Sequence, residues 1–281
     1  MKAKVFLFVI LFVALLIYAP ALAEKRFSSR IISLGPSITE SLYLLGEGER
    51  IIAVTTYCRR PIEARKKERI GTIRESNVEK IISLRPDLVI ATSLTNPRIV
   101  EKLRKIGVKV VVFSEPKNFA LLCEQFLELA ALIGKEEDAA RVLKEATTRI
   151  NALREKVRGL GSPTVFIQVG AKPLFAATGN TFINDFVVFA GAHNIAGDAA
   201  SGLYSREEVL KRNPEVIFIV TMGISGEEEK TVWEKYRTLD AVRNKRIYFI
   251  DSDKACSPTP LGFAETLEEI VLVLHPELEE R

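Results

Sequence analysis

The chain has 281 residues, with 40 lysines and arginines, 36 acidic residues and a formal net charge of +4 at pH 7. This nearly even balance argues against a nucleic-acid-binding protein, because such proteins carry a clustered basic excess. The length suits two modest lobes better than one small core, and three cysteines cannot form a complete disulfide framework.

The N-terminal residues have the pattern of a secretory signal peptide. Lys2 and Lys4 precede an uncharged apolar run, 5–18, and Ala21-Leu22-Ala23 is a small-x-small cleavage site. The run is too short to cross a bilayer comfortably, although an uncleaved anchor is the alternative. We therefore predict a signal peptide over residues 1–23, cleavage after Ala23 and a free periplasmic protein. No cysteine follows the site, which argues against a lipid anchor.

Residues 24–135 alternate apolar strand-like runs with helical patterns. Continuous apolar strands between helices are typical of a mostly parallel sheet that is covered on both faces. We expect strands over 30–34, 51–57, 87–92 and 108–113, and helices over 37–45, 78–84 and 97–106. The pattern predicts an N-terminal α/β lobe.

A long helical segment follows this lobe. Residues 118–133 predict one helix, and after Gly134 the stretch 136–158 contains neither proline nor glycine. Its apolar positions alternate at spacings of four and three, which predicts an amphipathic helix about 34 Å long. We expect it to bridge two lobes as a rigid rod and to limit their opening to small hinge or twist motions.

Residues 159–281 repeat the alternation of strands and helices. We expect strands over 164–169, 215–220 and 246–251, and helices near 181–190, 205–213, 230–240 and 260–274. The predicted fold is α/β, with two Rossmann-like lobes bridged by a single long helix and a ligand cleft between the lobes.

One unit of sequence occurs in both lobes. "NVEKIISLRPDLVI" at 77–90 returns as "SREEVLKRNPEVIF" at 205–218. The alignment pairs Asn77 with Ser205, Glu79 with Glu207 and Asp87 with Glu215. Each copy predicts a capped helix, a proline stop and a buried strand.

Candidate ligand contacts follow the predicted strands, because ligands of open α/β sheets lie beyond the carboxyl ends of the strands. These candidates are Ser37, Tyr57, Cys58, Arg59, Arg60, Ile73, Thr92, Ser93, Lys172 and Cys256. Ser37 and Glu40 match a capping box, whose amides either hold an anion or only cap the helix. Arg59, Arg60 and Lys172 favour an anionic ligand, unless they are ordinary solvated charges.

The cysteines allow several readings. Cys58 and Cys256 are expected in cleft-facing loops of opposite lobes, as free thiols, soft metal ligands or a bridge. We expect free thiols, because a bridge would pin the lobes together. Cys123 has the helical spacing of a core residue.

Motifs of catalysis and metal binding are absent from the sequence. The only histidines, His193 and His275, are far apart, and there is no H-E-x-x-H, G-x-S-x-G or Walker loop. We therefore predict a protein that is not an enzyme, has no cofactor and has no direct metal ligands.

Several stretches in order resemble a known family. "RIISLGPSITESLYLLGEGERIIAVTTYCRRP", "VEKIISLRPDLVIAT" and "GVKVVVF" are similar to the iron-complex and cobalamin-binding periplasmic proteins. These are the class III, helical-backbone receptors of ABC importers. The resemblance implies a monomer that captures a metal chelate of the ferric siderophore type and delivers it to a permease dimer with ATPase subunits. A corrinoid is the alternative ligand, and an exported enzyme or a sensor on this fold is the alternative class.

The resemblance also gives the repeated glutamates a role. Glu79 and Glu207 match the exposed glutamates with which each lobe docks onto the permease; the alternative is that they only complement the helix dipole. The ligand stays open: Tyr57 and the "YCxxP" stretch resemble cobalamin-binding proteins. However, Ile73, Thr92 and Ser201 stand where the best-known cobalamin receptor has tryptophans, and Pro260-Leu261 lacks an arginine common in siderophore receptors.

Overall fold

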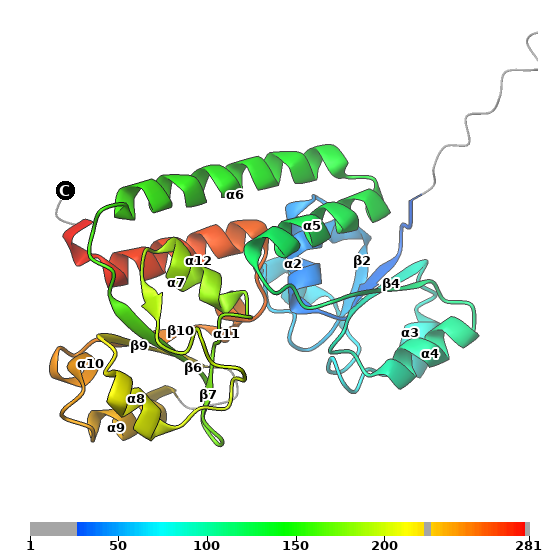
Figure 1. Cartoon of the computed structure of the whole chain (residues 1–281). Coiled ribbons are helices and arrows are strands. Elements are labelled where there is room, and N and C mark those ends of the chain that lie inside the picture. Colours follow the sequence, from blue (N-terminus) through cyan, green and yellow to red (C-terminus); the bar gives the residue numbers. More distant parts are fainter. Residues whose placement is uncertain (1–26, 222–225, 279–281) are drawn as a thin grey trace, which may run out of the picture.

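The structure, a computed structural model, describes residues 27–221 and 226–278. Figure 1 shows two lobes side by side beneath one long helix, α6. The predicted signal peptide over 1–23, with its cleavage after Ala23, lies outside the described residues. In the described part of the chain, no helix is long and apolar enough to cross a membrane.

The N-terminal lobe is built on a five-stranded parallel sheet in the order β3-β2-β1-β4-β5. The strands are β1 (Ile31–Ser33), β2 (Ile51–Val54), β3 (Glu68–Arg69), β4 (Leu88–Thr92) and β5 (Val110–Phe113). The helices are α2 (Pro36–Leu44), α3 (Val78–Ser83) and α4 (Pro97–Lys105), with 3-10 turns η1 (Gly48–Arg50) and η2 (Ile62–Lys66). The central strands β1 and β4 are buried along their whole length, as their unbroken apolar runs predict.

The C-terminal lobe has a second sheet in the order β10-β9-β6-β7, and β8 also pairs with β6. The strands are β6 (Thr164–Gly170), β7 (Phe175–Ala176), β8 (His193–Asn194), β9 (Val216–Val220) and β10 (Ile247–Ile250). The helices are α7 (Ile183–Phe189), α8 (Arg206–Arg212), α9 (Gly226–Glu234), α10 (Asp240–Arg243), α11 (Ser252–Ala255) and α12 (Pro260–Leu274), followed by η3 (Pro276–Leu278). Among the described strands of this sheet, β7 alone runs antiparallel.

The expected helix over 230–240 is two helices, α9 and α10. The extended backbone of Leu239 separates them, and its side chain is buried in the core cluster that also contains Trp233. The core contact therefore overrides the helical pattern at this point.

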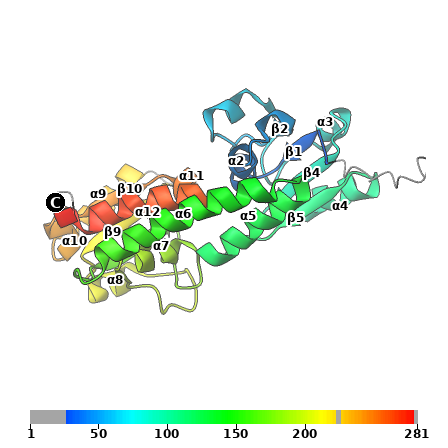
Figure 2. The same cartoon turned by 90° about the horizontal axis from the view of Figure 1, so that it is seen from above.

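Helices α5 (Phe119–Ile133) and α6 (Glu136–Val157) connect the lobes. Ala139 and Val142 of α6 pack into the core of the N-terminal lobe, whereas Ile150 and Leu153 pack into the core of the C-terminal lobe. Seen from above, α6 runs along both lobes with α12 beside it (Figure 2). One amphipathic helix thus shares its apolar face between two cores.

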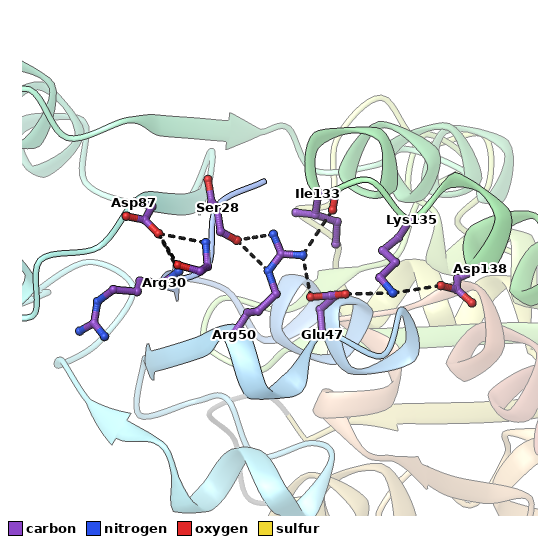
Figure 3. Close-up of polar contacts among 9 residues, drawn as sticks. Ser28, Arg30, Glu47, Arg50, Asp87, Ile133, Lys135 and Asp138 are labelled. Carbon is purple, nitrogen blue, oxygen red and sulfur yellow. Dashed lines mark hydrogen bonds and ion pairs between the residues drawn. The ribbon is translucent and has the colours of Figure 1, made fainter. Parts of the chain in front are cut away.

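A polar cluster fixes the corner between α5 and α6 to the N-terminal lobe (Figure 3). The Arg50 guanidinium donates to the carbonyls of Ser28 and Ile133 and lies 2.7 Å from the Glu47 carboxylate. Lys135 contacts the same carboxylate at 3.1 Å, and this contact raises the pKa of Lys135. The cluster ties the start of the long helix to the chain entering β1.

The repeated unit starts its helix in the same way in both lobes. Asn77 caps α3 by accepting a hydrogen bond from the Lys80 amide at 2.9 Å, and Ser205 caps α8 by accepting one from the Glu208 amide at 3.1 Å. Equivalent side chains thus perform the same capping task.

The repeated unit also ends in the same way. Arg85 and Asn213, each just before the proline, have φ values of 46° and 44°. Asp87 then accepts hydrogen bonds from the amides entering β1, and Glu215 accepts one from the amide of Thr164 at the start of β6. Both carboxylates hold the first strand of their lobe against the strand that follows the repeated helix.

Candidate functional site

A small pocket lies beyond the carboxyl ends of β1 and β4. These adjacent strands connect to β2 and β5, which lie on opposite sides of them in the sheet. Its walls include Ser37, Thr92, Glu115 and Gln125 from the N-terminal half and Cys256 from the C-terminal lobe. Because both lobes contribute, the pocket belongs to the cleft between them. Its volume of about 40 Å³ has room for about three water molecules. A ligand of the size expected from the sequence would therefore need space outside this pocket, or a wider separation of the lobes.

The titratable groups of this pocket favour their neutral forms. Burial raises the pKa of Glu115, and the hydrogen bond from Thr92 opposes this effect. Burial, with the nearby carboxylates of Asp253 and Asp251, raises the pKa of Cys256 to about 11. The thiol is therefore protonated at neutral pH and is a weak nucleophile. Among the described residues, no group of three or more His, Cys, Asp or Glu side chains could hold a metal ion.

Cys58 does not face the cleft, so this prediction is wrong. Its side chain is fully buried in the core of the N-terminal lobe, and its sulfur lies 3.2 Å from the hydroxyl oxygen of Thr55. The turn after β2 exposes Tyr57 and turns the next side chain inward. Burial raises the pKa of the Cys58 thiol, and Cys58, Cys123 and Cys256 are all free cysteines.

The prediction of a capping box at Ser37 is also wrong. Helix α2 begins one residue earlier, at Pro36, whose fixed φ suits the first helical position. The N-cap is then Gly35, without a side-chain hydrogen bond. Ser37 lines the pocket from inside the first turn, and Glu40 pairs with a different partner.

That partner is Arg60, one of the two arginines expected to contact the ligand. Its guanidinium lies 2.8 Å from Glu40, which also accepts a hydrogen bond at 3.4 Å from Thr259, the N-cap of α12. Burial raises the pKa of Glu40, and the charge of Arg60 opposes this shift. The contact joins the two lobes, and the carboxylate offsets the positive charge that Arg60 would bring to the cleft.

A basic depression of about 460 Å³ lies near the carboxyl ends of β2 and β3, lined by Thr56, Arg59, Arg65 and Arg69. Arg69 donates to backbone carbonyls of the turn after β2, and Arg65 donates to the carbonyl of Arg59. Within the described ranges, these three arginines form no ion pair. We call these four residues the basic depression. Arg59 was expected to contact a ligand, whereas Arg65 and Arg69 were not. The density of basic residues over 59–69 is the feature of the sequence that indicates a basic surface here.

Exposed apolar side chains lie near the same edges of the sheets. Tyr57 and Leu94 of the N-terminal lobe are 49% and 48% exposed, and Phe175 and Leu203 of the C-terminal lobe are 41% and 58% exposed. Phe175 and Leu203 pair through an isolated antiparallel bridge. Tyr57 is one of the ligand contacts expected from the sequence, whereas Phe175 and Leu203 were not among the candidates. Their signal is a large apolar residue in a turn that follows a strand.

Three further expected contacts lie outside the small pocket. Ser93 and Lys172 are exposed in the turns after β4 and β6, and Ile73 is half-buried in the loop that leads to α3. The structure thus brings Ser37, Thr92 and Cys256 together at one pocket and distributes the other expected contacts around it.

The repeated glutamates are exposed, and each lies in the first turn of its helix. Glu79 belongs to α3 and Glu207 to α8. Figure 1 shows these helices in separate lobes, on the side of the molecule away from α6. Each lobe therefore carries one of the two repeated glutamates on a helix at the side of the molecule away from α6.

Comparisons with known proteins place these features in a family. The sequence pattern of the family described as periplasmic binding protein matches residues 31–254. An ABC transporter substrate-binding lipoprotein of Bacillus subtilis, itself uncharacterised, is 29% identical over 90% of this chain and 82% of its own. A vitamin B12-binding protein of Yersinia pestis is 32% identical over 73% of this chain and 74% of its own. A crystal structure of a possible iron-binding periplasmic protein of Staphylococcus epidermidis superposes with a TM-score of 0.80 at 28% identity, covering 89% of this chain and 100% of that one.

Proposed function

Because this chain belongs to the periplasmic binding protein family and is an ABC substrate-binding protein of the helical-backbone type, we propose that it captures a metal chelate in the periplasm for an ABC importer. The observation that carries this proposal is the pocket at the carboxyl ends of the strands, walled by both lobes. Two lobes that share one ligand site suit capture and release. The family consists of transport proteins, which supports a role without catalysis.

The chemistry around the cleft supports the ligand class. Tyr57, Phe175 and Leu203 offer apolar surface to an organic ligand, and the basic depression offers uncompensated positive charge to its anionic groups. In the described part of the chain, His, Cys, Asp and Glu side chains do not gather into a metal site. The proposed ligand is therefore a metal that is already held by an anionic chelator, as in a ferric siderophore.

A corrinoid is the second candidate. The observation that favours it is the 32% identity to a vitamin B12-binding protein, together with exposed Tyr57 and Phe175, which could pack on a macrocycle. Ile73 and Thr92 stand where the best-known cobalamin receptor has tryptophans. This difference favours a siderophore-type chelate over a corrinoid.

Delivery requires contact with the transporter. We propose that Glu79 and Glu207 dock onto basic pockets of the two permease subunits, one lobe on each subunit. Their exposure and their equivalent positions in a repeated unit support this role, because a two-fold symmetric partner presents two equivalent contacts.

The experiment that tests the ligand is native mass spectrometry of the protein purified from its own periplasm. Cells are grown with limiting iron, with and without added vitamin B12. We expect one metal chelate per protein, whose mass identifies a siderophore or a corrinoid. Recovery of a metal-free sugar or peptide as the bound ligand would contradict the proposal.

A further inference from the structure

A buried polar network joins helix α8 to strand β6. Arg206 lies 2.8 Å from the Glu229 carboxylate, and the same oxygen of Glu229 accepts a hydrogen bond of 2.8 Å from the side-chain amide of Gln168. Gln168 in turn accepts a hydrogen bond of 2.7 Å from the indole of Trp233. The Arg206 guanidinium also lies 4.5 Å over the Trp233 ring. We call these four residues the α8 network. Gln168 and Trp233 are fully buried, and Glu229 is 5% exposed.

The α8 network extends from the proposed docking surface at Glu207 to the turn after β6, which we expect to face the ligand. Arg206 is the first residue of α8 and directly precedes Glu207, the proposed docking residue. Gln168 lies near the end of β6 and also donates to the carbonyl of Gly170, which leads into the turn that carries Lys172. The docking helix and the ligand-side turn are therefore joined through buried side chains.

A second link between the same two segments runs through the backbone. The amide of Tyr204 donates to the carbonyl of Leu174 at 3.0 Å, and the amide of Ala176 donates to the carbonyl of Gly202 at 2.8 Å. Tyr204 is followed at once by Ser205, the N-cap of α8. Movement of the ligand-side turn would therefore act on the start of α8 through both links.

The N-terminal lobe shows that the repeated unit does not require this network. Val78 occupies the position equivalent to Arg206, directly before Glu79, and packs against the apolar core of its lobe. A buried ion pair often contributes no more to stability than apolar packing of the same volume. The C-terminal lobe thus has a polar network at the position where the N-terminal lobe forms the same helix with an apolar contact.

We propose that Arg206 and Glu229 are positioning residues for delivery to the importer. They set the direction of the first turn of α8, and with it Glu207, according to the position of the ligand-side turn. This inference rests on the proposed docking role of Glu207. It adds to that role a specific structural link between the ligand site and the docking surface, present in the C-terminal lobe only.

The test uses Arg206→Met combined with Glu229→Gln, because removing both charges leaves no unpaired charge in the core. The intact, ligand-free protein is titrated onto its detergent-solubilised importer by bio-layer interferometry. We expect the affinity to fall roughly tenfold, within the usual range of coupling effects. In the free protein, amide hydrogen exchange should become faster both in residues 205–209 and in residues 170–174. The control is Arg243→Gln, which removes the exposed pair of Arg243 with Asp240 and should change neither quantity.

The outcomes separate this inference from the docking proposal. Glu207→Lys should lose most of the importer affinity, and unchanged affinity in that variant would overturn the docking role itself. If Glu207→Lys loses affinity while the double variant binds and exchanges like the wild type, the positioning role is wrong. If the double variant does not fold, Arg206→Lys decides, because it keeps a charge for Glu229 but loses the planar group over Trp233. We expect an intermediate loss of affinity, and wild-type affinity and exchange would overturn the inference.

Discussion

Arg59 and Arg60 are adjacent in the sequence and have different roles in the structure. Both follow β2 and both were expected to make the cleft positive. Arg60 is paired with Glu40 and lies at the contact between the lobes, whereas Arg59 lines the basic depression without an ion-pair partner in the described residues. Charge in this loop therefore serves the fold at one position and is available to a ligand at the other.

The two arginines predict different effects of the same substitution. Arg59→Gln should weaken binding of the anionic chelate roughly three- to tenfold and flatten its salt dependence, with little change in stability. Arg60→Gln should lower the free energy of unfolding by about 1–2 kcal/mol, because Glu40 loses its partner in a mostly buried site. Titration calorimetry with an anionic ferric tris-catecholate and with vitamin B12, beside urea unfolding, checks both. Equal effects of the two variants on binding would refute this separation.

Which side of a turn a residue faces could not be predicted from the sequence. Placing residues after strands identified Ser37, Thr92 and Cys256 as neighbours of one pocket, since strand ends fix where loops gather. The same reasoning misplaced Cys58, because the turn after β2 exposes Thr56 and Tyr57 but turns Cys58 inward, and a small thiol packs well in the core. Side-chain direction depends on local backbone geometry that composition does not specify.

Among the helices and strands, long periodic or continuous apolar segments were predictable. The buried strands β1, β4, β6 and β9 and the helix α6 match their expected positions to within a few residues. The two-residue strands β3, β7 and β8 were missed because so few residues carry no periodic signal. Their pairing depends on tertiary contacts with β2, in the case of β3, or with β6, and not on their own sequence.

The carboxylate that ends the repeated unit predicts a pH-dependent contribution to stability. Asp87 accepts hydrogen bonds from the Ser29 hydroxyl and from two backbone amides, and these contacts lower its pKa below the ordinary value of 3.8. A lowered carboxyl pKa gives stability that is present above about pH 3.8 and is lost as the pH falls through the folded-state pKa. Asp87 is solvent-exposed, so Asp87→Asn should cost only about 1 kcal/mol at pH 7.

Urea unfolding of the wild type and of Asp87→Asn between pH 2.5 and pH 7 measures this contribution. The difference in unfolding free energy should shrink below about pH 3.8. Glu215→Gln, at the equivalent position of the other lobe, serves as the matched variant for the loss at pH 7. A difference that stays constant across the whole pH range would argue against an ionised Asp87 as its source.

The molecule as a unit combines two similar lobes, the bridging helix α6 and a polar contact between the lobes. α6 belongs to both cores, and the contact of Glu40 with Arg60 and Thr259 adds a second connection between the lobes. Because α6 is one helix that packs into the cores of both lobes, we expect ligand entry and release to depend on small relative motions of the lobes about it.

We propose that this protein delivers its ligand by docking one glutamate of each lobe, Glu79 and Glu207, onto an importer. Charge reversal of both, Glu79→Lys with Glu207→Lys, places like charges across the proposed contact. Reversal of two exposed glutamates on α6, Glu137→Lys with Glu145→Lys, changes the net charge equally on the opposite side of the molecule.

The most direct measurement is uptake of the radiolabelled ligand into vesicles that contain the importer, beside the affinity of each variant for that ligand. The docking variant should bind ligand like the wild type and support almost no uptake, each single reversal should lose part of it, and the α6 variant should transport normally. Normal uptake by the double docking variant, with ligand affinity intact, would contradict the account and leave the repeated glutamates with only their favourable interaction with the helix dipole.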